Sequence, residues 1–314
     1  MEEVNAAQMN PTKIILDTDM STDVDDAGAL AVLHALADAG EAEILAVMHN
    51  TGHPLGVPVI EIINRYYGRS GLAVGALKSD FDNEAARPYL TALVENFPSQ
   101  LRRESAPDAT KLYRQILAAQ PNASVVIVSI GFLTNLRALL ESGPDEFSPL
   151  SGAELVAQKV RDVVMQGGDF PTSDRPSWNY AHAGATPYTQ AVIDNWPAPM
   201  TFVGYDIGLR IKTCAILENA PETNPVRLAY FNFFDNRHLG RESWDLVCVL
   251  VAVRGLGNGF ERVSGGTNRI LEDGNNCWDS TVANPHHSYL VQRVSDQELE
   301  AVLEELLIQE PAKH

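Results

Sequence analysis

The chain has 314 residues, 45% of them hydrophobic and 20% charged, which is the composition of an ordinary globular protein. Its 41 acidic residues outnumber the 23 basic ones and give a formal net charge of −18. Because so acidic a surface repels nucleic acid and anionic membranes, we expect neither as a partner.

Three widely separated cysteines show no metal-ligand spacing, which favours reduced thiols and a cytoplasmic protein. No apolar run is long enough to span a bilayer, and the first residues lack the apolar core of a signal peptide. Residues 1–10 are expected to form a flexible tail and residues 11–309 a single domain.

Short apolar, mostly β-branched runs alternate along the chain with longer amphipathic stretches. The expected strands are 14–16, 44–48, 72–74, 125–128, 160–165 and 200–203. The expected helices are 25–39, 58–67, 111–119, 133–140, 185–194 and 242–254. Asp273-Gly274 is a hairpin-turn signal. This alternation predicts an α/β fold: an open, mostly parallel sheet covered by helices on both faces.

Five aspartates stand within ten residues, directly after the first expected strand. They are Asp17, Asp19, Asp23, Asp25 and Asp26. Carboxylates held this close repel one another, and a bound divalent cation is the usual way in which a fold tolerates them. In parallel sheets the ligand binds outside the carboxyl ends of the strands, which is where this cluster falls. The cluster is therefore the candidate active site.

Three other interpretations fit less of the cluster. A calcium-binding EF-hand loop starting at Asp17 would need Gly and Glu where Thr22 and Gly28 stand. Phosphohydrolases of the haloacid dehalogenase type also begin with a strand and Asp-x-Asp, but their later paired acids have no convincing match here. Helix capping would explain the last three acids of the run, but not the two at the strand end.

Six short motifs follow one another between residues 12 and 300. They are Asp17-Thr18-Asp19 with Asp25-Asp26-Ala27, His49-Asn50, Gly131-Phe132-Leu133-Thr134-Asn135, Val163-Val164-Met165-Gln166-Gly167-Gly168, Trp178-Asn179 and Ser243-Trp244-Asp245. Together they resemble the inosine–uridine-preferring nucleoside hydrolase family, in a subgroup whose first spacer is two residues longer than in the best-known members. The resemblance implies a nucleoside hydrolase-like sheet and hydrolysis of the N-glycosidic bond of ribonucleosides or related N-ribosides.

The resemblance also implies a Ca²⁺ site and a sugar site. The implied metal ligands are Asp19, Asp26, the backbone oxygen of Thr134, and Asp245. All are hard oxygen donors, as Ca²⁺ requires. The residues implied to bind substrate are Asp25 and Asn50 on the ribose hydroxyls, Asn179 and Met165 beside the sugar, and Trp178 stacked on base or sugar.

Glycosidic cleavage develops positive charge on the ribose, which a carboxylate-rich site stabilises. The resemblance implies that Asp19 is the general base for a water polarised by Ca²⁺. The family's leaving-group histidine is replaced here by Trp244, so His182 is the candidate acid. Ser177 stands where the family has a glutamate that contacts the 5′-hydroxyl.

These two replacements motivate a second hypothesis, a non-catalytic nucleoside- or ribose-binding protein. The family also implies a homo-oligomer, a dimer or tetramer. Two structural expectations complete the sequence analysis. Asp17 should accept backbone N–H bonds that support its loop, and His286-His287 should lie on the surface.

Overall fold

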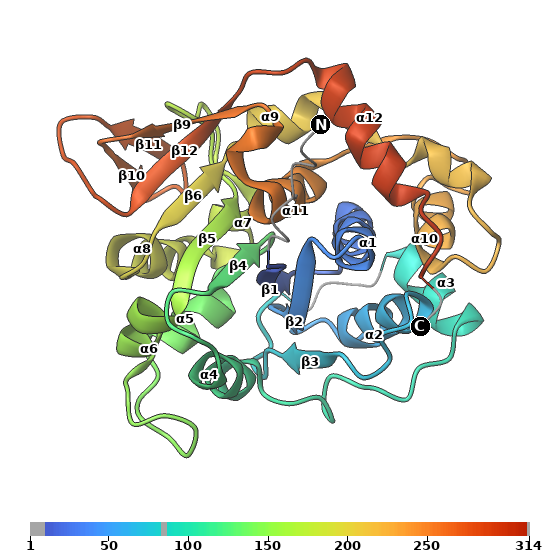
Figure 1. The fold of residues 1–314 in the computed structure, drawn as a ribbon, viewed down its shortest axis with the longest axis horizontal. Helices are drawn as coiled ribbons and strands as arrows, with labels where there is room; N and C mark the ends of the chain where they lie inside the picture. The colour runs from blue at the N-terminus through green and yellow to red at the C-terminus, as the bar shows by residue number, and fades with distance from the viewer. Residues whose placement is uncertain (1–9, 83–86, 313–314) are drawn as a thin grey trace, which may run out of the picture.

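A computed structural model describes residues 10–82 and 87–312, so all but the last residue of the expected tail 1–10 lies outside the described residues. Its main sheet has eight strands in the order β3-β2-β1-β4-β5-β6-β12-β9 (Figure 1). Their bounds are β1 Thr12–Thr18, β2 Ala42–His49, β3 Ala73–Ala76, β4 Val125–Ser129, β5 Val160–Gln166, β6 Met200–Val203, β9 Phe260–Ser264 and β12 His287–Gln292. All neighbours pair in parallel except β9, which is antiparallel to β12. The predicted mostly parallel sheet is confirmed.

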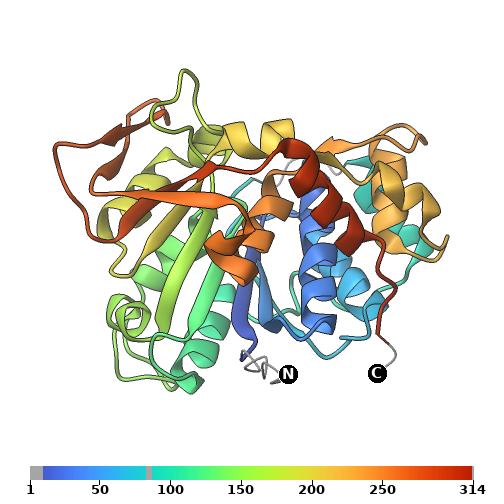
Figure 2. The ribbon, with the colours of Figure 1, turned by 45° about the horizontal axis from the view of Figure 1, so that its top comes forward.

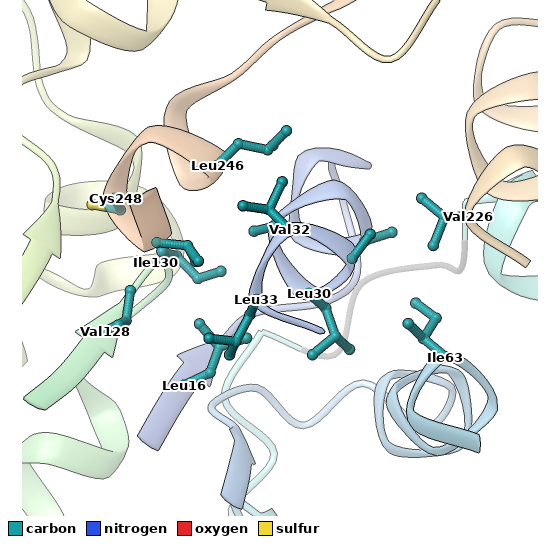
Figure 3. Close-up of a cluster of buried hydrophobic side chains, with 14 of the residues drawn as sticks. Leu16, Leu30, Val32, Leu33, Ile63, Val128, Ile130, Val226, Leu246 and Cys248 are labelled. Carbon is teal, nitrogen blue, oxygen red and sulfur yellow. The ribbon is translucent and has the colours of Figure 1, made fainter. Parts of the chain in front are cut away.

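Helices cover both faces of this sheet. One face carries α1 (Asp25–Asp38), α2 (Gly56–Tyr66), α3 (Pro88–Asn96), α10 (Pro225–Phe233), α11 (Trp244–Arg254) and α12 (Asp296–Leu307). The other carries α4 (Ala109–Ala119), α5 (Thr134–Leu140), α6 (Gly152–Lys159) and α8 (Thr186–Asn195). Alternate side chains of each strand divide between the two cores, since Leu16 packs on the first and Ile15 on the second. Figure 3 shows Leu16 gathered with side chains of α1 and α11.

Helix α1 has almost no exposed face. Every residue from Asp25 to Leu36 is buried, because α1 packs against β2, α11 and α12 (Figure 2). A helix that is apolar all round belongs inside a protein. Its N-terminal acids, Asp25 and Asp26, are therefore carried into the interior, where they are only 4% and 2% exposed.

The last predicted helix and the predicted position of a histidine pair differ in the structure. The last predicted helix begins at Trp244, because the preceding Arg241–Glu242 form a short strand, β8, paired with β7 (Lys212–Thr213). The surface interpretation of the histidine pair is wrong for His287, which is 2% exposed. Its Nδ1 accepts the N–H of Asn268, and its Nε2 bonds the carbonyl of Ile193.

The predicted hairpin turn is confirmed. It joins β10 (Thr267–Ile270) to β11 (Asn276–Asp279), with Gly274 at φ 82°, a left-handed conformation that favours glycine. The hairpin projects beside the β9–β12 edge of the main sheet (Figures 1 and 2). Among the described residues, no helix combines the length and apolar character needed to cross a membrane.

Candidate active site

A pocket of about 390 Å³ opens at the carboxyl ends of the central strands. Its wall draws on the β1–α1 loop, on Ile130 after β4, on Gln166 at the end of β5, and on Tyr205 after β6. The strand-end rule for parallel sheets predicts a ligand site at this place. Five carboxylates line the pocket: Asp19, Asp23, Asp25, Asp26 and Asp245.

Three of these carboxylates converge. Oxygen atoms of Asp25, Asp26 and Asp245 lie within 4.8 Å of one another, and all three side chains are buried. Helices α1 and α11 pack side by side, which brings the first turn of one helix against the first turn of the other. Three buried carboxylate oxygens this close together form a donor set that fits a hard divalent cation.

Burial raises the pKa of each acid in this group, and the neighbouring carboxylates raise it further. For Asp245 the added repulsion comes first from Asp25 and Asp26. For Asp19 burial is again the largest cause, followed by the charge of Asp25. A cation bound among these oxygens would favour their ionised forms.

Asp19 lies in close contact with the turn after β4. A Cβ added at Gly131 would stand 2.6 Å from Asp19 Oδ1 and 2.8 Å from Asn50 Nδ2, so only glycine allows this approach. Asn50 in turn donates to Asp17 Oδ1 at 2.7 Å. The turn and the first strand end are thus locked together behind the pocket.

Asp17 is buried away from the pocket, and its expected backbone partners are wrong. Its carboxylate accepts side-chain bonds from Asn50, from the Tyr113 hydroxyl at 2.7 Å and from Asn135 at 3.2 Å. The nearby backbone N–H groups of Asn50 and Ile130 instead bond backbone carbonyls. Burial raises the pKa of Asp17 to about 7, and the three hydrogen bonds oppose that rise.

Asp23 is neutralised by an arginine that the sequence did not suggest. Arg241 Nε donates to Asp23 Oδ1 at 2.9 Å, and its Nη2 donates to Oδ2. The guanidinium also lies 5.0 Å from the ring centre of Trp244. Arg241 and Asp23 are 218 residues apart in the chain, so no local pattern could have linked them.

The structure brings some of the predicted site residues to the pocket and leaves others outside it. Asp19, Asp25, Asp26, Trp178, Asn179 and Asp245 line the wall. Asn50, Met165, Thr134 and His182 are not part of the wall formed by the described residues. Asn50 and Met165 are fully buried.

Thr134 begins α5, and its hydroxyl donates to the backbone oxygen of Asn50. Four residues earlier, Ile130 lines the pocket directly after β4. The converging carboxylate oxygens therefore include Asp26 and Asp245 of the predicted ligands and add Asp25, but they do not include Asp19. The predicted ligand roles of Asp19 and Thr134 remain predictions.

His182 stacks on Trp178, with ring centres 3.6 Å apart and planes at 13°. Its Nε2 lies 3.8 Å from Asp82 Oδ1. Trp178 is 48% exposed and lines the pocket, whereas His182 is not among the lining residues. Asn179 donates to Gln166 Oε1 at 2.7 Å, which orients its amide.

Several wall residues escaped the sequence analysis: Thr22, Arg87, Ile130, Gln166, Tyr205, Phe233 and Arg241. Ile130, Gln166 and Tyr205 end or follow predicted strands, so the strand-end rule could have identified them. Phe233 and Arg241 had no such signal, since they reach the pocket only through the packing of α10 and β8.

No protein-family model and no curated protein sequence matches the chain. Solved structures do. A plant nucleoside hydrolase has 19% identity and a TM-score of 0.68, covering 95% of this chain and 99% of its own. An inosine–guanosine nucleoside hydrolase has 17% identity and a TM-score of 0.71, covering 96% and 100%. The type III effector XopQ, complexed with adenosine diphosphate ribose, has 15% identity and a TM-score of 0.65, covering 97% and 95%. The chain therefore has the nucleoside hydrolase fold.

Proposed function

We propose that this chain is a Ca²⁺-dependent N-ribohydrolase of the long-spacer nucleoside hydrolase subgroup, which cleaves ribonucleosides or related N-ribosides into base and ribose. One observation carries the proposal. A strand-end pocket in a nucleoside hydrolase fold holds three converging buried carboxylates, with Asp19 and Asn179 on the same wall.

The converging oxygens of Asp25, Asp26 and Asp245 would hold the cation. When bound, Ca²⁺ supplies Lewis-acid polarisation of a water and of the ribose hydroxyls. Asp19 lies on the same wall and would take the proton of the attacking water as the general base. The ionised carboxylates of the wall stabilise the positive charge that develops on the sugar.

Asn179 is held by Gln166, so its free amide oxygen is positioned to accept a bond from a sugar hydroxyl. Trp178 supplies a flat apolar surface for the base or the sugar. At Ser177 the hydroxyl accepts the N–H of Gly168 at 3.1 Å, so this residue supports the strand end of β5.

Incubation with inosine and uridine tests the hydrolase directly. We expect equal amounts of base and ribose, loss of turnover with a chelator, and recovery on adding Ca²⁺. Asp19→Ala should abolish turnover, whereas Asp194→Asn, at an exposed position of α8, is the matched control and should not. Full activity in Asp19→Ala would refute the assigned base.

A second candidate is a non-catalytic binder of ribose-containing ligands. Trp244 and Ser177 favour it, and the XopQ structure shows that a protein of this fold can be complexed with adenosine diphosphate ribose. Binding of a nucleoside, measured by calorimetry, without release of base or ribose under any metal condition would support the binder over the enzyme.

A further inference from the structure

We infer that the preferred substrates are N-ribosides whose base carries a positively charged ring nitrogen, such as pyridinium ribosides. This inference rests on the proposed function and names its substrate class. Two independent properties of the pocket support it: the shortage of a proton donor for a neutral leaving base, and an aromatic, negatively charged wall.

A neutral nucleobase leaves as an anion unless an acid protonates it, so its hydrolysis depends on a general acid. Among the described residues that line the pocket, none is a histidine. Trp244 has one N–H, and it donates to the carbonyl of Tyr205 at 3.0 Å. Arg241 is a permanently charged donor already engaged by Asp23 and Glu242.

The remaining polar groups of the wall are also committed or unsuitable as acids. The amide of Asn179 donates to Gln166, and amides are not proton donors in this chemistry. Asp25, Asp26 and Asp245 are the proposed cation ligands, which bind a cation in their ionised forms. His182 stacks on Trp178 and does not line the pocket. Arg87 is, like Arg241, permanently charged, which leaves the hydroxyls of Thr22 and Tyr205 on the wall. We test the Tyr205 hydroxyl and the nearby His182 separately.

A cationic base requires no acid. As water adds to C1′, the electron pair of the C1′–N bond returns to the ring nitrogen, and the base leaves as a neutral molecule. The single proton to be removed is that of the water, which Asp19 accepts. The reaction is balanced with the groups that the pocket contains.

The charge of the wall favours the same substrate class. The pocket wall carries five carboxylates and the guanidiniums of Arg87 and Arg241. With one divalent cation bound, one excess negative charge remains. Trp178, Tyr205, Phe233 and Trp244 add aromatic faces. His182 covers one face of Trp178, and a cationic ring on its other face gains a cation–π attraction.

A binding measurement tests the charge of the base separately from its ability to act as a leaving group. With the Asp19→Ala variant and Ca²⁺, tryptophan fluorescence would be titrated with 3-carbamoylpyridinium riboside and with 3-carbamoylphenyl riboside, its neutral carbon isostere. Because this variant lacks the one excess negative charge, we expect the cation–π attraction alone to give about 10-fold tighter binding of the cation. Trp178→Leu should reduce that preference. Equal affinities for the two isosteres would overturn the inference.

Turnover gives the second test, with kcat/KM measured for the pyridinium riboside, uridine and inosine. We expect the neutral nucleosides to be at least about 100-fold poorer, the contribution of a missing acid. Trp244→His, which introduces an imidazole into the pocket, should raise the ratio of inosine turnover to pyridinium-riboside turnover about 10-fold or more.

Tyr205→Phe and His182→Ala should leave the ratio of inosine to pyridinium turnover unchanged. If either variant selectively lowers inosine turnover, that side chain is the acid and the inference is wrong. Comparable cleavage of both substrate types would also overturn the inference while sustaining the hydrolase. If neither type is cleaved, the proposed function fails, and the isostere titration still decides the charge preference.

Discussion

Asp17 on the one hand, and Asp25 and Asp245 on the other, are buried carboxylates that the protein treats in opposite ways. Asp17 accepts three hydrogen bonds from side chains of three different elements. In the described part of the chain, Asp25 and Asp245 receive no hydrogen bond from a side-chain donor, although burial and mutual repulsion act on both. The comparison separates an acid that supports the fold from acids left for a ligand.

Replacing an aspartate by alanine should therefore destabilise the fold at Asp17 but not at Asp245. Asp17→Ala removes the acceptor of Asn50, Tyr113 and Asn135. It leaves the Asn50 amide and the Tyr113 hydroxyl buried without partners, whereas Asn135 still donates to the carbonyl of His49. We expect a loss of about 4 kcal/mol in the free energy of unfolding, measured with urea. Asp17→Asn keeps one acceptor oxygen and should cost less. An Asp17→Ala variant with an unchanged free energy of unfolding would mean that these bonds do not stabilise the fold.

Asp245→Ala removes charge repulsion among the carboxylates and leaves no hydrogen-bond donor without its acceptor. The metal-free protein should lose no stability, but its Ca²⁺ affinity should fall by at least about 100-fold, because a ligand itself is removed. Calorimetric titration of Ca²⁺ measures the change, with Asp194→Asn as the exposed control. Unaltered Ca²⁺ affinity would show that the cation does not bind at this group.

The buried His287 keeps both of its hydrogen bonds only while its imidazole is neutral. Burial lowers the pKa of His287 to about 4, and protonated Nδ1 would face the N–H of Asn268. The unfolded chain takes up a proton below about pH 6.5, whereas the folded chain does so only near pH 4. Stability should therefore fall as the pH drops through this window, by about 2 kcal/mol between pH 7 and 5. Urea unfolding of the wild type and His287→Gln at both pH values isolates this contribution, which should be absent in the variant.

The sheet and its site could be anticipated from local patterns. The apolar runs at 14–16, 125–128 and 200–203 are buried strands, and four of the five acids after the first run line the pocket. Periodicity also identified α1. It could not show that α1 lies inside on every side, because that depends on α11 and α12, more than 200 residues later.

The division of the acidic run into different roles also escaped the sequence. Five aspartates within ten residues look alike in a linear sequence. Asp17 differs from Asp25 because α4 and α5 supply Tyr113 and Asn135 to the first and not to the second. Asp23 differs because β8 brings Arg241 to it.

By itself, the sequence determined that a parallel α/β sheet would present a cluster of carboxylates at its strand ends, because strand periodicity and charge are local properties. Only the tertiary structure decided which carboxylates have hydrogen-bond partners, that the oxygens of Asp245 converge with those of Asp25 and Asp26, and that His182 stacks on Trp178. Hydrogen bonding and Coulomb repulsion act over a few ångströms in space, so they follow from the packing of distant elements rather than from distance along the chain.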